Sequence, residues 1–142
     1  GQQRLVALGG ALAMEPEALV LDEPIAGLDP RGAAHLREHV RALHARGVAV
    51  LMISHSMEDV AELADRVIVL DHGRIALAGT SAEVFSHGEA LHKLGLGTPA
   101  PLELAHGLEG AGVFAPGELG QPLTASALVT NITRLRGGDR PC

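Results

Sequence analysis

Aromatic residues are almost missing from this sequence, which has no Trp, no Tyr and only two Phe, Phe85 and Phe114. Proteins that bind single-stranded nucleic acid stack its bases on aromatic rings. The formal net charge of −6 also differs from the basic stripe that nucleic-acid-binding domains usually present to phosphates. We therefore expect no nucleic-acid partner.

Cysteine and long apolar runs are also scarce. The single cysteine, Cys142, excludes an internal disulfide and a cysteine zinc cluster, which fits a reducing cytoplasm. The longest apolar run is far too short to span a membrane, and no secretory signal is visible. We therefore expect no direct membrane insertion. The 46% of hydrophobic residues and 20% of charged residues are sufficient for a folded core.

Two acidic residues follow the apolar run at residues 18–21, which is bounded by Pro16 and Pro24. Such a run is typical of a short parallel strand buried on both faces, and it places Asp22 and Glu23 at the carboxyl end. Open α/β sheets bind their ligands at that end. Adjacent carboxylates repel each other unless a cation intervenes, so one would bind Mg²⁺ and the other a water or hydroxyl. An ordinary acidic turn is the alternative interpretation.

A second strand is predicted over residues 48–53, and it ends in Ser54 and His55. The interval between the two strands has room for one helix and its return, so the strands can be neighbours. Their carboxyl ends would then bring Asp22, Glu23 and His55 to one edge. A histidine at a strand end can also be purely structural.

Further elements follow from local signals. Asp29 and Pro30 predict a helix start, and Gly47 predicts its end after Arg46. Further helices are expected over residues 2–14, 90–94, 102–108 and 124–135. Two more helices are expected to begin at Ser56 and at Thr80, the second with a capping box to Glu83. A hairpin is expected over residues 66–78. Asp29 can serve as a plain helix cap.

The segment from His35 to His39 matches the H-x-x-E-H pattern of one class of zinc peptidases. His35 and His39 would share a helix face, with Glu38 nearby. Short patterns also arise by chance, and zinc catalysis needs a third ligand. We favour a solvated helix face.

In combination, these motifs resemble the second half of the ATP-binding subunit of ABC transporters. By this resemblance, residues 19–23 form the Walker B segment, 26–29 the D-loop, and His55 is the switch histidine. Gly1, Gln2, Gln3 and Arg4 resemble the tail of the signature motif, although the helix that follows can be an ordinary amphipathic one. Residues 64–71, 73–75 and 79–84 follow the closing pattern of the family.

The resemblance implies an α/β fold, a partial P-loop NTPase of the ABC type. We expect a three-layer sandwich whose parallel sheet lacks the Walker A strand, because no G-x-x-x-x-G-K-[ST] phosphate loop occurs in the sequence. Its place would be between 48–53 and 66–70, where an exposed apolar slot would remain. Residues 1–85 would form the carboxyl-terminal half of the ATPase domain, and 86–142 a partly helical extension. We expect a carboxyl-terminal piece of a longer protein, inactive by itself.

The resemblance also implies site roles, with ATP and Mg²⁺ as cofactors. Asp22 would hold Mg²⁺, Glu23 would polarise the attacking water, and His55 would contact the γ-phosphate. The residues expected to help bind the nucleotide are Gly1, Gln2, Asp29 and Ser54.

The carboxyl-terminal extension resembles that of energy-coupling factor (ECF) ATPases, which power import of vitamins or of nickel and cobalt. Partners would be a second ATPase subunit, identical or different, and transmembrane permease subunits, with the protein peripheral on the cytoplasmic face of the cell membrane. A variable tail without a role is the alternative. Two other functions stay open: a non-hydrolysing fragment that binds another ATPase subunit, and an ABC ATPase outside transport.

Overall fold

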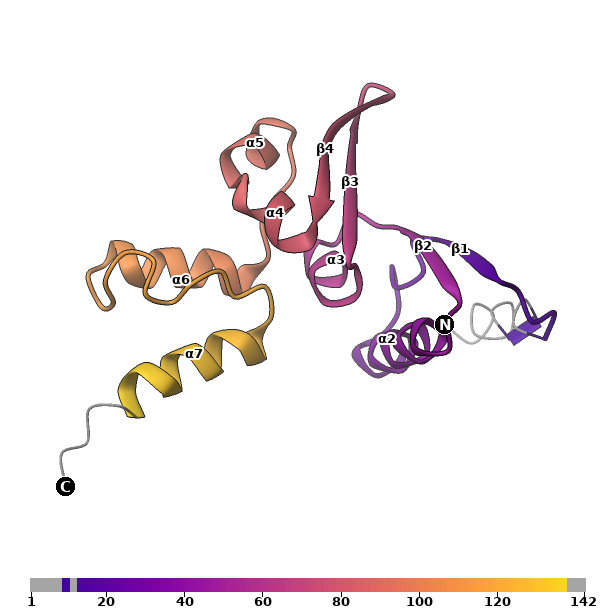
Figure 1. Cartoon of the computed structure of the whole chain (residues 1–142), viewed down its shortest axis with the longest axis horizontal. Helices are drawn as coiled ribbons and strands as arrows, with labels where there is room; N and C mark the ends of the chain where they lie inside the picture. Colours follow the sequence, from indigo (N-terminus) through magenta and orange to yellow (C-terminus); the bar gives the residue numbers. More distant parts are fainter. Residues whose placement is uncertain (1–8, 11–12, 138–142) are drawn as a thin grey trace. The chain divides into compact units, whose positions relative to one another are not determined.

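The computed structural model describes residues 9–10 and 13–137. In chain order its elements are β1 (Ala18–Asp22), α2 (Pro30–Ala45), β2 (Ala49–Ile53), α3 (Met57–Leu63), β3 (Arg66–Asp71), β4 (Arg74–Thr80), α4 (Ser81–Ser86), α5 (Gly88–Lys93), α6 (Ala100–Gly110) and α7 (Ala125–Gly137) (Figure 1). Residue contacts divide the chain into two compact units, 1–59 and 60–142.

In the first unit, β1 and β2 pair in parallel, and α2 connects them. The register aligns Ala18 with Ala49 and Asp22 with Ile53, so both strands end at the same edge. This confirms the predicted neighbouring parallel strands. The register also places the residues that follow each strand side by side, and these are Glu23 and Ser54.

The helix α2 begins and ends as the sequence predicts. Asp29 is its N-cap, and its Oδ1 atom accepts a hydrogen bond of 2.6 Å from the backbone N–H of Gly32. Gly47 follows the helix with a φ of +87°, which glycine adopts without strain. The buried residues Ala33, Leu36, Val40 and Leu43 form one apolar stripe of this helix.

The expectation that the first strand is buried on both faces is wrong for this structure, and its partner β2 is also open on one face. Leu19 is buried, but Val20, Leu51 and Ile53 are 64%, 60% and 51% exposed. Side chains alternate between the two faces of a strand, so one face of the pair is covered and the other is open. The apolar slot predicted between 48–53 and 66–70 concerns a strand edge and not this face, so it stays a prediction.

In the second unit, β3 and β4 form the predicted antiparallel hairpin. Its two-residue turn has positive φ at both His72 (+45°) and Gly73 (+75°), as the right-handed twist of the strands favours. The sequence predicted the glycine but not the strained histidine. The described strands form two separate two-stranded sheets, and none of them joins β2 to β3.

The helices after the hairpin follow local signals. The hydroxyl of Thr80 accepts from the N–H of Glu83, and the carboxylate of Glu83 accepts from the N–H of Thr80, so the predicted capping box of α4 is confirmed. The helices α5, α6 and α7 overlap the segments where helices were expected, with ends that differ by one to two residues. Between α6 and α7, Ala105, Leu119 and Leu128 form a small core, against which Leu108, Phe114, Ile132 and Leu135 pack.

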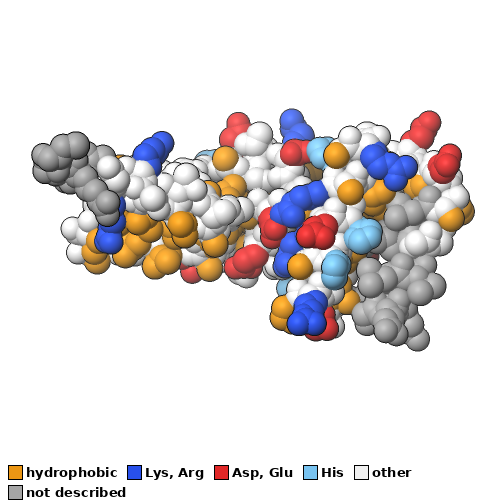
Figure 2. Space-filling model, turned by 90° about the horizontal axis from the view of Figure 1, so that it is seen from below, with side chains coloured by type: hydrophobic (Ala, Val, Ile, Leu, Met, Phe, Trp, Pro, Cys, Tyr) orange, Lys and Arg blue, Asp and Glu red, His pale blue; other side chains and the backbone are white. Residues whose placement is uncertain are grey.

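Figure 2 shows one face of the molecule, on which charged and histidine side chains gather over α2 and hydrophobic side chains over α7.

No helix within the described ranges is both long and apolar enough to cross a membrane. The expected helix over residues 2–14 lies largely outside the described residues. The domain boundary expected at residue 85 stays a prediction, since the division at residue 59 reflects contacts alone.

Candidate functional site

The parallel register of β1 and β2 brings the predicted acidic pair and the predicted histidine to one edge. Beyond the last aligned pair, Asp22 and Ile53, the N–H of Glu23 donates to the carbonyl of Ile53 at 2.9 Å. This bond extends the pairing by one residue. The backbone of the β1 end and the backbone that leads to His55 are therefore joined directly.

Glu23 and His55 are also joined through their side chains. The Oε1 atom of Glu23 accepts a hydrogen bond of 3.0 Å from the backbone N–H of His55 and lies 2.6 Å from Nδ1 of its ring. The Glu23 side chain is 33% exposed and that of His55 is 77% exposed. The carboxylate thus holds both the backbone and the ring of the histidine, while the ring stays accessible to a ligand.

The backbone of Glu23 adopts a φ of +44°, in the left-handed region that non-glycine residues rarely occupy. Such conformations persist where surrounding contacts impose them, and they gather at functional sites. Here the imposing contacts are the three from Glu23 to Ile53 and His55. Glu23 is also the residue that the sequence analysis expected to polarise the attacking water.

The other candidate residues lie around this pair. Asp22 is exposed at the end of β1. The Oγ atom of Ser54 accepts from the N–H of Ser56 at 3.1 Å, which makes Ser54 part of the turn around His55. Asp29 caps α2, so its structural role is established and a further role in nucleotide binding stays a prediction. Gly1 and Gln2 lie outside the described residues.

A magnesium ion fits the donors of this edge only as a partly hydrated ion. Mg²⁺ is usually bound by one or two carboxylates, several waters and substrate phosphates, without a cage made only of protein groups. The exposed carboxylate of Asp22 suits that mode of binding. Within residues 9–10 and 13–137, no group of three or more His, Cys, Asp or Glu side chains could hold a metal ion.

The H-x-x-E-H segment forms part of the exposed face of α2. Nδ1 of His39 lies 2.6 Å from the carbonyl of His35, and Nδ1 of His35 lies 3.9 Å from a carboxylate oxygen of Glu38. All three side chains face solvent. This arrangement is the solvated helix face that we favoured.

Sequence reasoning missed one ion pair in the same unit. Nε and Nη2 of Arg37 donate to Oδ1 of Asp59 at 2.8 and 2.6 Å. The sequence places Asp59 in the first turn of a helix, where an acid is unremarkable. No sequence pattern indicates that this acid is buried against α2, because its partner is 22 residues away.

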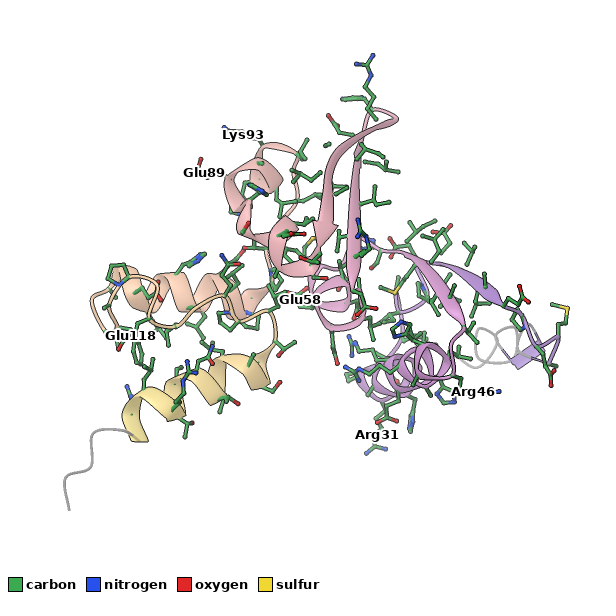
Figure 3. The ribbon with its side chains drawn as sticks, viewed as in Figure 1. Arg31, Arg46, Glu58, Glu89, Lys93 and Glu118 are labelled. Atoms are coloured by element: carbon green, nitrogen blue, oxygen red, sulfur yellow. The ribbon has the colours of Figure 1, made fainter. Side chains whose placement is uncertain are left out.

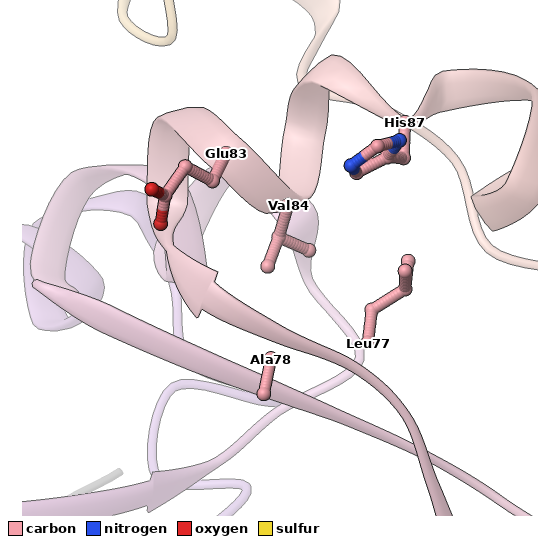
Figure 4. A pocket seen from close by; sticks show the side chains of 5 residues that line it. All are labelled: Leu77, Ala78, Glu83, Val84 and His87. Carbon is pink, nitrogen blue, oxygen red and sulfur yellow. The ribbon is translucent and has the colours of Figure 1, made fainter.

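A shallow hollow of about 310 Å³ lies in the second unit, lined by Leu77, Ala78, Glu83, Val84 and His87 (Figure 4). Its only carboxylate belongs to the capping box. The backbone N–H of Thr80, and then its hydroxyl, lower the pKa of Glu83 by hydrogen bonding to the ionised form. The carboxylate of Glu83 therefore stabilises the start of α4, and the imidazole of His87 is the other polar side chain that lines the hollow.

Solved structures show the class to which this fold belongs. The chain is 33% identical to a nucleotide-free ATP-binding cassette from an ABC transporter, with a TM-score of 0.59 over 66% of this chain and 37% of that one. It is 36% identical to cbiO1 from Clostridium perfringens, part of the ABC transporter complex cbiONQ, with a TM-score of 0.53 over 73% and 41%. The chain therefore belongs to the ATP-binding subunits of ABC transporters and has part of their P-loop NTPase fold.

Curated relatives give the group within that family. Energy-coupling factor transporter ATP-binding protein EcfA2 from Symbiobacterium thermophilum is 44% identical over 142 residues, which are 99% of this chain and 49% of that protein. The protein of the same name from Clostridium perfringens is 50% identical over 113 residues, 79% of this chain and 40% of that protein. The chain is thus most like the ECF group, and it spans about half the length of the curated relatives it matches. No family model matches it.

Proposed function

We propose that this chain supplies the Walker B, D-loop and switch-histidine part of an ATPase that powers solute import through an ECF-type transporter. The observation that supports this most directly is the contact of Glu23 with the backbone and ring of His55 at the shared edge of two parallel strands. The similarity to EcfA2 proteins agrees with it. The solute would be a vitamin, nickel or cobalt.

In this proposal Glu23 is the general base that orients and polarises the attacking water. Its position at the carboxyl end of β1 is where a ligand of an α/β sheet lies. A positioned base contributes roughly 10²–10⁴-fold to a rate. His55, held by Glu23 and exposed at its ring, would donate a hydrogen bond to the γ-phosphate.

The remaining roles concern the nucleotide. Asp22 would hold Mg²⁺ through its water shell, and the bound ion would neutralise charge on the phosphates of ATP. Asp29, Ser54 and the segment at Gly1 and Gln2 would contribute to nucleotide binding. A phosphate loop would come from outside these 142 residues, because the sequence contains none.

The partners would be a second ATPase subunit and transmembrane permease subunits. The protein would then lie peripherally on the cytoplasmic face of the membrane. The similarity to cbiO1, part of a transporter complex, supports this assembly.

The proposal is tested by Glu23→Gln in the full-length ATPase that contains this chain. ATP binding should be retained, while phosphate release falls by about 10²-fold or more, because the amide cannot accept the proton of water. Glu17→Gln is the matched control, since Glu17 is an exposed acid next to the other end of β1. Phosphate release by Glu23→Gln at the wild-type rate would remove Glu23 from this role.

A second candidate is a fragment that does not hydrolyse ATP but binds another ATPase subunit. The open face with Val20, Leu51 and Ile53 favours it, because exposed apolar surface favours association. Copurification distinguishes the two functions. An ATPase subunit of a transporter should copurify with a permease, and the interaction fragment only with an ATPase chain.

A further inference from the structure

We propose that Arg37 and Asp59 form a positioning pair that keeps His55 in place for the reaction. The proposal deepens the proposed function and rests on it, because it concerns the same histidine. Neither residue was among the predicted site residues. Both lie in the first unit, Arg37 on α2 and Asp59 in the first turn of α3.

The pair has the geometry of a strong, partly desolvated contact. Two nitrogens of the Arg37 guanidinium donate to Oδ1 of Asp59, at 2.8 and 2.6 Å. The Asp59 side chain is only 5% exposed, and that of Arg37 is 24% exposed. A carboxylate with so little access to water needs a cationic partner, and charge-assisted bonds of this kind are short and strong. Asp59 is therefore anchored to α2.

A short chain of hydrogen bonds connects Asp59 to the residues around His55. The N–H of Asp59 donates to Oγ of Ser56 at 3.3 Å, and the N–H of Ser56 donates to Oγ of Ser54 at 3.1 Å. His55 lies inside this turn. The turn is attached to the strand edge through Glu23, which accepts from the N–H of His55, and to α2 through Asp59.

The exposure of His55 explains why these anchors matter. With a side chain that is 77% exposed, the histidine has little packing of its own to hold it. Its position therefore depends on its backbone and on Glu23. A misplacement of about 1 Å at a reacting centre can cost ~10²-fold in rate, so a shift of the 54–59 turn would be felt in catalysis.

The first test is Asp59→Asn in the full-length ATPase. We expect kcat to fall about tenfold, within the loss that a small misplacement causes, with the KM for ATP changed less than about twofold. Glu58→Gln is the matched control, because Glu58 is the neighbouring acid of the same helical turn and is exposed (Figure 3). A wild-type kcat for Asp59→Asn would overturn the proposal.

The second test separates positioning from folding. The double variant Arg37→Met with Asp59→Asn removes both charges, so it leaves no uncompensated buried ion and should fold even where a single variant does not. We expect its kcat to stay about as low as that of Asp59→Asn, because the same link is missing. Full recovery of kcat in the double variant would contradict a positioning role.

The decisive comparison repeats Asp59→Asn in the His55→Ala background. If Asp59 acts through His55, the second substitution lowers kcat by less than about twofold there. A full tenfold further loss would overturn the proposal and leave the role of His55 intact. A wild-type kcat for His55→Ala alone would instead refute the proposed function.

Discussion

Glu23 and His55 are 32 residues apart in sequence, yet Oε1 of Glu23 lies within hydrogen-bonding distance of both the N–H and the Nδ1 atom of His55. Both residues follow parallel strands that end at one edge. The carboxylate and the imidazole therefore form a hydrogen-bonded pair, and the position of each side chain should depend on the other.

The first prediction concerns the histidine of this pair. His55→Ala in the full-length ATPase should lower kcat about 10²-fold, in the range that loss of one transition-state donor causes. ATP binding should persist, because the contact matters most when charge develops on the phosphate. Phosphate release and equilibrium nucleotide binding measure the two effects. His39→Ala, an exposed histidine of α2, is the control and should retain wild-type turnover.

The second prediction separates two roles of Asp29. Its Oδ1 atom caps α2 by accepting from Gly32, and asparagine can accept the same bond. Asp29→Asn should therefore preserve stability, whereas Asp29→Ala should cost about 1 kcal/mol in the free energy of unfolding. Thermal unfolding measures this difference.

The same two variants also report on nucleotide chemistry. If the carboxylate itself contributes to the site, Asp29→Asn will lower kcat while it keeps the melting temperature. Equal kcat for Asp29→Asn and wild type would restrict Asp29 to its role as a cap.

The third prediction concerns Glu109, whose carboxylate accepts from the N–H groups of Gly117 and Leu119, both at 2.9 Å. These two bonds lower the pKa of Glu109, and the bond from Gly117 has the larger effect. Because the folded-state pKa is depressed, the stabilisation is present above the unfolded-state pKa and is lost as pH falls through the lower folded-state pKa. Glu109→Gln should therefore loosen the loop between α6 and α7 at pH 7.

Hydrogen exchange of the Gly117 and Leu119 amides measures this loosening. Exchange should be faster in Glu109→Gln than in wild type at pH 7, and the difference should disappear below the folded-state pKa. Glu89→Gln is the control, since Glu89 is an exposed acid of α5 (Figure 3). Equal protection in Glu109→Gln and wild type at pH 7 would show that the carboxylate does not hold the loop.

The fourth prediction concerns the open face of β1 and β2. Val20, Leu51 and Ile53 expose more than half of their surface there, so the 142-residue chain by itself should self-associate or be only marginally stable. Sedimentation and scanning calorimetry test this. Val20→Ser with Leu51→Ser should reduce association, whereas Val129→Ser, at an exposed valine of the second unit, should not. A monomer that melts cooperatively would contradict the prediction.

The same chain should not hydrolyse ATP, because it lacks a phosphate loop.

Local features were the most predictable from sequence. The cap at Asp29, the glycine stop at Gly47 and the capping box of Thr80 and Glu83 involve residues at most a few positions apart. The convergence of Glu23 and His55 was also predictable, because the carboxyl ends of neighbouring parallel strands share an edge. To predict that the two strands are neighbours, it was enough that the segment between them is long enough for one crossover helix.

The sequence by itself therefore determined the elements, their ends and the edge at which the candidate site lies, since hydrophobic period and capping act over short distances. Only the tertiary structure decided that one face of β1 and β2 is open, that Glu23 adopts a positive φ, and that Arg37 neutralises the buried Asp59. Each of these depends on which distant residues pack together. Burial and charge pairing are properties of that packing, and no local pattern of residues encodes them.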